Sequence, residues 1–149
     1  MAIKCVKEDK ETGYQRIEND EGLWGLADQD NIFIVSYKYQ YIAPFVNGFA
    51  RVKNEDGWGF IDTNGVEVIK CQYYFVYDFY EERAIVYDGR YFGSIDTSGK
   101  EVIPRKFDYL GNFYEGLTYA CIDAEYFYVD RDGNYVCDEL QKPHARTRK

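Results

Sequence analysis

The sequence predicts an all-β repeat protein, in which a unit of 34 residues occurs about three and a half to four times. Three observations predict this fold class. Aspartates recur at Asp28, Asp62, Asp96 and Asp130, each 34 residues after the one before. Aromatic residues make up 19% of the chain, and they favour half-buried pleated surfaces. Apolar residues alternate at a spacing of two in short segments, which is the period of a β-strand.

Other columns of the self-alignment keep the same interval. An aromatic residue stands four residues before each aspartate, and a glycine follows that aromatic in the first three copies. A glycine also stands three residues after the last three aspartates, where the first copy has Asn31. We expect a structural role for these positions: Trp24, Gly25, Asp28, Trp58, Gly59, Asp62, Gly65, Phe92, Gly93, Asp96, Gly99, Tyr126, Asp130 and Gly133.

Each unit is predicted to contain three or four short strands. The expected elements of the second copy are, in order, a strand at 49–53, a turn at 54–57, a strand at 58–62, an Asp-x-x-Gly turn at 62–65, a strand at 66–69 and an aromatic connection at 72–79. In such a turn the aspartate carboxylate accepts hydrogen bonds from its own turn, and glycine or asparagine adopts the positive φ. These turns exclude the helical repeats that share a 34-residue period, because no helix would continue through them.

One hairpin cannot bury its apolar face alone, so neighbouring copies must stack. We expect residues 1–141 to form one domain with repeats at about 14–48, 49–82, 83–116 and 117–140, followed by a basic flexible tail at 142–149. The favoured arrangement is an open solenoid-like array capped by Tyr14–Asn19 and by the last strand. The alternative is a closed ring of the same units, like a propeller or barrel.

At this point the chain resembles a known family. The segments from Glu55 to Ile69, EDGWGFIDTNGVEVI, and from Gly93 to Leu117, GSIDTSGKEVIPRKFDYLGNFYEGL, are similar to the WG (tryptophan–glycine) repeats that are widespread in bacteria. The resemblance covers roughly Tyr14 to Leu140, with the second and third copies matching best. It implies a β-hairpin repeat architecture. It implies no reaction, because the family is defined by its repeat, and it supplies no catalytic residues.

Composition narrows the possible partners. The net charge is −8, and an acidic surface repels nucleic acid, so we expect no nucleic-acid binding. No apolar stretch is long enough for a transmembrane helix and no signal peptide is expected, which predicts a cytoplasmic protein without membrane contact. The four cysteines lack paired spacing, and we expect free thiols. They are Cys5, Cys71, Cys121 and Cys137.

Motifs for catalysis are weak. The one histidine, His144, stands in the tail, far from any ordered nucleophile. The segments that begin at Asp62 and Asp96 resemble paired aspartic-protease motifs, but their glycine comes one residue late and the aspartate occurs in every copy. Carboxylates at spacing two occur without the distal glutamate of a calcium loop. We therefore expect a protein that is not an enzyme and has no cofactor or metal.

Tyrosines that depart from the repeat are the candidate binding residues, because tyrosine tolerates partial exposure and is enriched at recognition surfaces. These candidates are Tyr37, Tyr39, Tyr41, Tyr74, Tyr77, Tyr80, Tyr87 and Tyr91. The first three alternate, so we expect them to share one strand face. Sheet-surface aromatics that only stabilise cross-strand pairs are the alternative interpretation.

Two functions remain open from the sequence. The first is a non-catalytic scaffold that binds a protein partner through a tyrosine-rich acidic surface. The second is a protein that binds or sequesters a small ligand, such as a cation, sugar or nucleotide, in an aromatic pocket. Open sheet edges also allow a homo-oligomer.

Overall fold

A computed structural model describes residues 2–140, and these form 16 strands in four antiparallel sheets of four strands each. The first sheet contains β1 (Ile3–Glu8), β2 (Gln15–Asn19), β3 (Trp24–Ala27) and β4 (Phe33–Tyr39). The second contains β5 (Tyr41–Val46), β6 (Phe49–Asn54), β7 (Gly57–Asp62) and β8 (Glu67–Tyr73). The third contains β9 (Phe75–Val76), β10 (Ala84–Tyr87), β11 (Phe92–Ile95) and β12 (Glu101–Phe107). The fourth contains β13 (Tyr109–Leu110), β14 (Leu117–Ile122), β15 (Glu125–Asp130) and β16 (Tyr135–Cys137).

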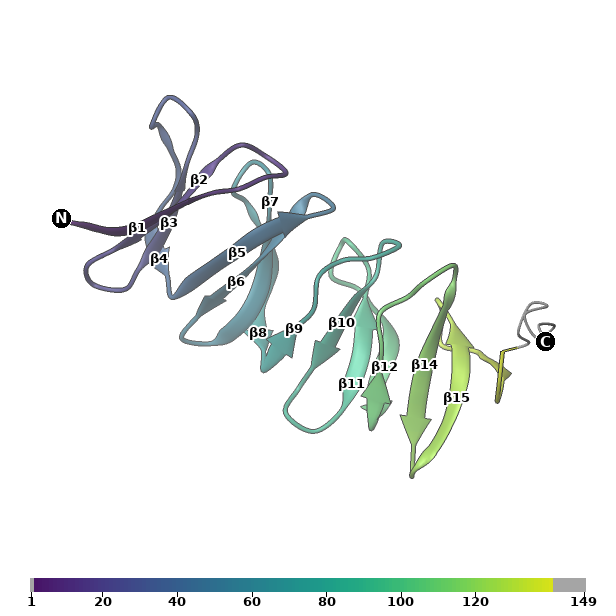
Figure 1. The fold of residues 1–149 in the computed structure, drawn as a ribbon. Helices are drawn as coiled ribbons and strands as arrows, with labels where there is room; N and C mark the ends of the chain where they lie inside the picture. Colours follow the sequence, from purple (N-terminus) through teal and green to yellow (C-terminus); the bar gives the residue numbers. More distant parts are fainter. Residues whose placement is uncertain (1, 141–149) are drawn as a thin grey trace, which may run out of the picture.

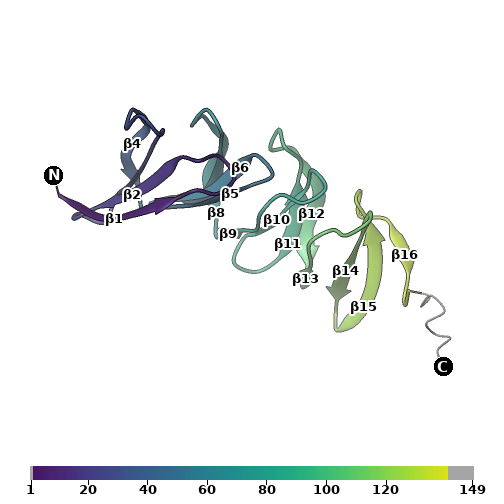
Figure 2. The ribbon, with the colours of Figure 1, turned by 45° about the horizontal axis from the view of Figure 1, so that its top comes forward.

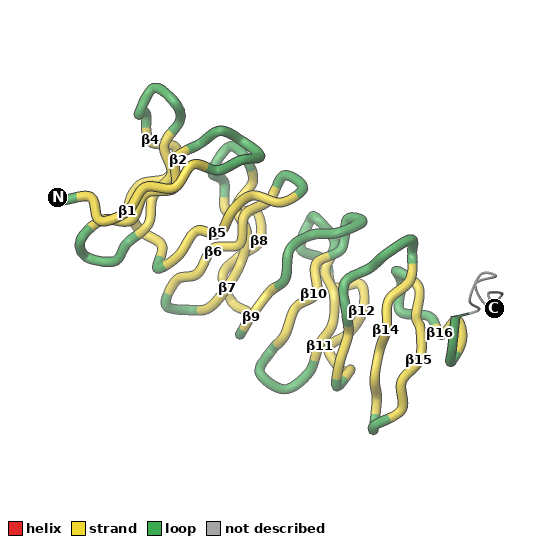
Figure 3. Tube along the Cα trace, in the orientation of Figure 1, coloured by secondary structure: helices red, strands yellow, loops and turns green. Residues whose placement is uncertain are grey.

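The four sheets follow one another along an open array (Figures 1 and 2), with the first and fourth at opposite ends. Each sheet is a meander in which consecutive strands pair. The all-β repeat array is confirmed, and the closed ring considered from the sequence is wrong. No described residue is helical (Figure 3), so the described part of the chain has no helix that could span a membrane. The predicted tail at 142–149, including His144, lies outside the described residues.

The sheets begin at a different point of the repeat from the boundaries expected above. The aromatic connection at 72–79 supplies β9, the first strand of the third sheet, and does not merely link two units. At the start of the chain, β1 pairs with β2, so the first unit is also a complete four-stranded sheet and begins at Ile3. A repeat has no intrinsic starting residue, and strand pairing decides where each unit begins.

Three hydrophobic cores lie between adjacent sheets. We call the face of a sheet toward the preceding sheet its front and the face toward the following sheet its back. The first core joins Leu26 and Val35 to Ile42 and Val52. The second joins Phe60 and Ile69 to Phe79 and Ile95, and the third joins Ile85 and Ile103 to Ala120 and Val129. Burial of apolar side chains thus stabilises the contact between units, as expected for a repeat array.

We call the repeated aromatic residue of each unit (Trp24, Trp58, Phe92 and Tyr126) its signature aromatic. In the first three units, the glycine that follows it lies directly beneath the fourth strand of the sheet. A Cβ atom at Gly59 would stand 2.3 Å from the carbonyl oxygen of Ile69, and one at Gly93 would stand 2.5 Å from that of Ile103. The first copy shows the same approach, at 2.8 Å between Gly25 and the Val35 carbonyl. These distances are shorter than atoms tolerate, so only glycine fits there.

The close approach arises from a bulge in the fourth strand of the first three sheets. In the second sheet Trp58 pairs with Tyr73, yet Phe60 pairs with Ile69, so β8 has extra residues opposite Gly59. An i,i+4 contact spans each bulge. The backbone N–H of Cys71 donates to Glu67 at 3.3 Å, that of Arg105 donates to Glu101 at 3.1 Å, and the rings of Phe33 and Tyr37 lie 5.1 Å apart. Each bulge therefore interrupts the alternation of side chains along its strand.

The predicted Asp-x-x-Gly turn has the expected hydrogen bonds in all four copies. In the second copy the Asp62 carboxylate accepts hydrogen bonds from the backbone N–H groups of Asn64 and Val66, both at 2.9 Å. The equivalent bonds form at the other three aspartates, Asp28, Asp96 and Asp130. The fourth turn position has positive φ, 80° at Gly65 and 64° at Asn31. Gly65 also lies against Ile34 and Val35 of β4, so this turn helps to join two sheets.

The first hairpin holds one residue more than its counterparts. Glu18 pairs with Trp24, whereas Lys53 pairs with Trp58 at the corresponding place. The extra residue hides an equivalence in the ungapped alignment: Arg16 and Arg51 occupy the same structural position. Their guanidinium groups lie over Trp24 at 5.9 Å and over Trp58 at 5.5 Å.

Replacing Gly59 tests the close approach. We expect Gly59→Ala to lower the free energy of unfolding by about 2–3 kcal/mol, because its methyl group would force the β8 backbone away from β7. Urea unfolding followed by circular dichroism measures this change. The matched control is Gly111→Ala, because a Cβ there would meet only side-chain atoms at 3.2 Å or more, which can move aside. Equal effects of the two substitutions would contradict this account.

Candidate binding site

Aromatic rings form a row along one edge of the array. The ring of Tyr41 lies between those of Trp24 and Trp58, at 5.1 and 6.2 Å, and Phe75 follows Trp58 at 5.2 Å. In the third unit Phe92 contacts Tyr109, the first residue of the fourth sheet, at 5.8 Å. The signature aromatic of one unit thus packs against the first strand of the next. Apolar contact at this edge joins consecutive sheets.

A groove of about 670 Å³ opens at this edge between the second and third sheets. Aromatic and acidic side chains dominate its lining, with Lys53 as its one basic side chain among the described residues. The lining residues are Lys53, Glu55, Asp56, Gly57, Trp58, Gln72, Tyr73, Tyr74, Phe75 and Asp88. The ammonium group of Lys53 donates a hydrogen bond to the Gln40 side chain at 3.0 Å. Three carboxylates, those of Glu55, Asp56 and Asp88, thus outnumber the single ammonium group, and the groove lining is net acidic.

Tyr74 is the most exposed aromatic residue of this lining, at 71%. It lies between the last residue of β8 and the first residue of β9, where the chain crosses from one sheet to the next. The hairpin after β10 supports its ring. A Cβ atom at Gly89 would be in ordinary van der Waals contact with the Tyr74 ring, and the Tyr87 ring meets it edge-on at 5.7 Å. One ring face is thus supported while much of the side chain stays open to solvent.

Asp88 places a carboxylate beside these rings. Its side chain accepts hydrogen bonds from the backbone N–H groups of Tyr91 at 2.8 Å and Arg90 at 2.9 Å. These two bonds lower the pKa of the Asp88 carboxyl below its ordinary value. The carboxylate consequently stays ionised at neutral pH and in mildly acidic solution. The groove therefore offers a fixed negative charge next to π-faces.

A smaller groove of about 230 Å³ occupies the equivalent place between the first and second sheets. Its lining contains Lys38 and Gln40, which correspond to Gln72 and Tyr74 of the larger groove. The repeat thus provides a groove at both junctions. Of these two grooves, the one between the second and third sheets has the exposed ring of Tyr74 in place of Gln40 and the uncharged Gln72 in place of Lys38.

The three tyrosines expected to share one strand face do not do so. Tyr39 is buried in the first core, where its hydroxyl donates to Glu67 of the next sheet. Tyr37 lies on the front of the first sheet against Phe33, because the bulge interrupts the alternation of β4. Tyr41 belongs to the second sheet and the aromatic row. The prediction was wrong because it treated 37–41 as one regular strand.

The remaining candidates divide between the groove and its surroundings. Tyr87 supports Tyr74, and Tyr91 belongs to the same hairpin, where Arg90 lies over its ring at 4.9 Å. Tyr77 contacts Phe75 at 5.0 Å and is partly exposed nearby. Tyr80 forms an isolated bridge with Arg83 in the loop after β9 and is absent from the groove lining. Tyr74 and Tyr87 are thus the predicted residues that the fold brings together.

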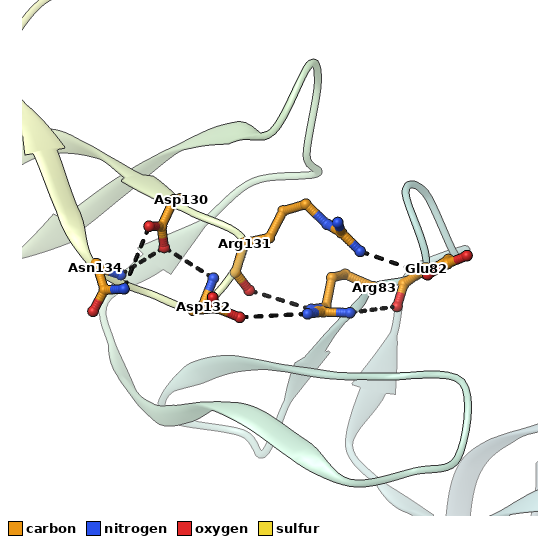
Figure 4. Close-up of polar contacts among 6 residues, drawn as sticks. All are labelled: Glu82, Arg83, Asp130, Arg131, Asp132 and Asn134. Carbon is orange, nitrogen blue, oxygen red and sulfur yellow. Dashed lines mark hydrogen bonds and ion pairs between the residues drawn. The ribbon is translucent and has the colours of Figure 1, made fainter.

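Grooves at other positions of the repeat contain more polar residues. Between the third and fourth sheets one groove of about 430 Å³ is lined by Glu81, Glu82, Glu115, Gly116 and Arg131. Figure 4 shows the contacts beside it: Arg83 pairs with Asp132 at 3.5 Å and donates to the Arg131 carbonyl at 3.2 Å, while Arg131 pairs with Glu82 at 3.7 Å. Arg83 stands where the second unit has Phe49, so polar contacts replace an aromatic one at this junction.

Cysteine and acidic side chains are the other potentially reactive groups among residues 2–140. No cluster of three or more His, Cys, Asp or Glu side chains that could hold a metal occurs in this part of the chain. The four cysteines are unpaired thiols within it, with Cys71 and Cys121 buried. The aspartate carboxylates of the repeated turns accept hydrogen bonds from the backbone of their own turns.

The WG containing repeat, as a family model, matches residues 24–58, 58–89 and 92–126, which is more than half of the chain. This chain belongs to the WG-repeat family. The matched segments begin at Trp24, Trp58 and Phe92, the aromatic positions that pack against the next sheet. No curated protein matches the chain.

The fourth copy of the unit, which begins where the last matched segment ends, departs from the repeated pattern for a structural reason. Its glycine position holds Phe127, whose ring contacts Phe107 at 6.4 Å and Tyr135 at 5.9 Å. The short strand β16 ends at Cys137, which pairs with Tyr128, and among the described residues no bulge passes over Phe127. Without a backbone above it, this position accepts a large side chain.

Thiol labelling tests the burial of Cys71. Burial, followed by the nearby Glu67 carboxylate, raises the pKa of the Cys71 thiol to about 12. Little thiolate therefore forms at pH 8, and we expect Cys71 to react with iodoacetamide more than about tenfold slower than the partly exposed Cys5 and Cys137. Peptide mass spectrometry of the native, dilute protein measures the rates. Equal rates in native protein would contradict the structure, and urea-unfolded protein provides the control.

Proposed function

We propose that this WG-repeat chain is a non-catalytic scaffold that binds a protein partner by taking a basic side chain into its acidic aromatic groove. The observation that carries the proposal is the junction of the second and third sheets, where Trp58, Tyr74 and Phe75 meet the Asp88 carboxylate. A guanidinium or ammonium group gains attraction from both the π-faces and the negative charge. Protein surfaces supply such groups on arginine and lysine.

The chain already contains an example of this chemistry. The Arg51 guanidinium lies 5.5 Å from the Trp58 ring and 5.6 Å from the Phe75 ring, and it pairs with Asp78 at 3.0 Å. Two aromatic rings and one carboxylate thus hold an internal arginine next to the groove. The exposed Tyr74 and Asp88 offer the same combination to an external one.

Repetition of the grooves favours a partner of extended shape. The two grooves of this edge occur at successive junctions, and they share Glu55 and Asp56 in their linings. A peptide lying along the edge would reach both grooves, and its basic residue would prefer the one with the exposed ring. Repeat arrays commonly use extended surfaces in this way.

A small cationic ligand is the second candidate function. Rings around a carboxylate also suit a quaternary ammonium group, and the groove volume of about 670 Å³ is sufficient for a small molecule. If choline raises the melting temperature and none of the basic peptides does, this alternative would be favoured over the protein partner.

Binding of a basic peptide tests the proposed function. Fluorescence anisotropy with peptides that differ only in a central Arg, Lys or Gln should show binding of the Arg and Lys forms and weak binding of the Gln form. We expect Tyr74→Ala to weaken binding of the Arg peptide by about tenfold, because the exposed ring is lost. Asp88→Asn should weaken it several-fold, since asparagine keeps the turn acceptor while losing the charge.

Two control variants separate the groove from the general surface. Asp30→Asn removes an exposed carboxylate outside both grooves, and Tyr114→Ala removes an exposed tyrosine outside them. Neither should change the affinity for the Arg peptide by more than about twofold. Equal binding of the Arg and Gln peptides, or no effect of Tyr74→Ala, would remove the proposed site.

A further inference from the structure

The back of the fourth sheet is an aromatic surface that no described residue covers. Ala120 and Val129 face the third core, so Tyr119 and Tyr128, which adjoin them along β14 and β15, point outward, as does Tyr126 two residues before Tyr128. The ring of Tyr119 stacks on that of Tyr126 at 5.0 Å and lies tilted against that of Tyr128 at 4.9 Å. Tyr119 and Tyr126 are 41% and 51% exposed. This back face of three tyrosines belongs to neither groove.

The same positions are covered in the preceding sheets. Tyr119 corresponds to Ile85 of the third sheet, and Tyr128 corresponds to Phe60 of the second and Ser94 of the third. All three inner residues are buried beneath the sheet that follows. The fourth sheet thus presents the surface that elsewhere in this chain forms a core.

The front of the first sheet is also apolar and uncovered by described residues. Val6 pairs with Ile17, which pairs with Gly25, and the Phe33 ring lies over Gly25 beside Tyr37. These side chains therefore share one face. Val6 is 49% and Phe33 45% exposed. Repeat arrays that remain monomeric usually need polar outer faces on their end units, and among residues 2–140 neither end sheet has one.

We propose that the back of the fourth sheet docks on the front of the first sheet of a second copy of this chain, in a head-to-tail assembly. The inner junctions carry the argument, because each of the three joins the back of one sheet to the front of the next. A head-to-tail contact continues that series between chains. The back of the fourth sheet would thus meet a sheet front, which is the kind of surface that each inner sheet back already contacts within the chain.

Charge favours this contact over one between two identical back faces. From Tyr109 to Leu140 the chain holds seven carboxylates and only one cation, Arg131. Two such units placed back to back would bring like charges together. The first strand of a second copy instead brings Lys4 and Lys7 beside its apolar residues. Lys4 already pairs with Glu18 at 3.6 Å, and residues 3–39 carry five basic and eight acidic side chains, so the head-to-tail contact brings less like charge together than a back-to-back contact would.

Such an interface is heterologous and leaves one free face at each end. The weight-average mass should therefore rise continuously with protein concentration. Because the whole chain is acidic, added salt should strengthen association by screening the repulsion between copies.

Mixing two variants tests the assembly by sedimentation velocity of the full chain. Val6→Glu blocks the front face by placing a charge where the second and third sheets carry the buried Ile42 and Val76, and Val6 itself is 49% exposed, so the sheet should tolerate the change. Tyr126→Glu blocks the back face. Each variant alone should associate at least tenfold more weakly than the wild type. An equimolar mixture should form a one-to-one dimer, because one intact back meets one intact front.

A cysteine of the wild-type chain gives a second measurement that needs no variant. Cys137 pairs with Tyr128 and so lies at the back face, whereas Cys5 pairs with Glu18 in the first sheet. Alkylation of Cys137 should slow severalfold as the protein is concentrated, while alkylation of Cys5 should stay constant. Thiol burial at the interface is the physical reason.

Other outcomes would overturn the proposal. Wild-type protein that stays monomeric at every concentration, with constant Cys137 reactivity, excludes the assembly. Dimers of Val6→Glu alone, with no gain on mixing, indicate a back-to-back contact instead. Tyr74→Ala should associate like the wild type, so failure of this assembly and failure of the peptide groove are distinguishable.

Discussion

The fold depends on the contact between a glycine in the third strand and the bulged backbone of the fourth. Where Gly59 lies under Ile69, the absence of a side chain lets β8 fold over β7. The bulge then sends Cys71 forward into the first core while Ile69 and Tyr73 face back into the second. One strand thus contributes to two cores. A side chain at the glycine would remove the space that the bulge occupies.

Stacking units by this rule also creates the surfaces on which the proposed binding depends. The first two junctions each have a groove on the aromatic edge, and the residues that depart from the repeat determine the chemistry of each groove. Tyr74 and Asp88 give the junction of the second and third sheets a ring and a charge, whereas Lys38 and Gln40 give the preceding junction a more polar lining. The end faces follow from the same rule, because an array of back-to-front contacts leaves one back and one front.

Part of the site could be predicted from the sequence. Tyr74 stood out because its column holds Gln40 and Asp108 in the neighbouring copies, and it proved exposed. Tyr39 could not be distinguished from it, because the bulge that turns Tyr39 into the first core depends on pairing with another strand. The role of Asp88 and the stack around Tyr119 were missed, since neither forms a motif along the chain. The equivalence of Arg16 and Arg51 was hidden by one extra residue in the first hairpin.

The sequence by itself determined the 34-residue period, the strands and the turns, because these rest on local chemistry: the side-chain period of a strand and the carboxylate that accepts its own turn's N–H groups. The tertiary structure decided where each unit begins, which tyrosines are buried and which faces stay open. These properties depend on contacts between residues far apart in the chain, such as Tyr39 with Glu67 and Gly65 with Val35. A repeated pattern specifies similar units, but only their packing fixes which side of each unit is covered.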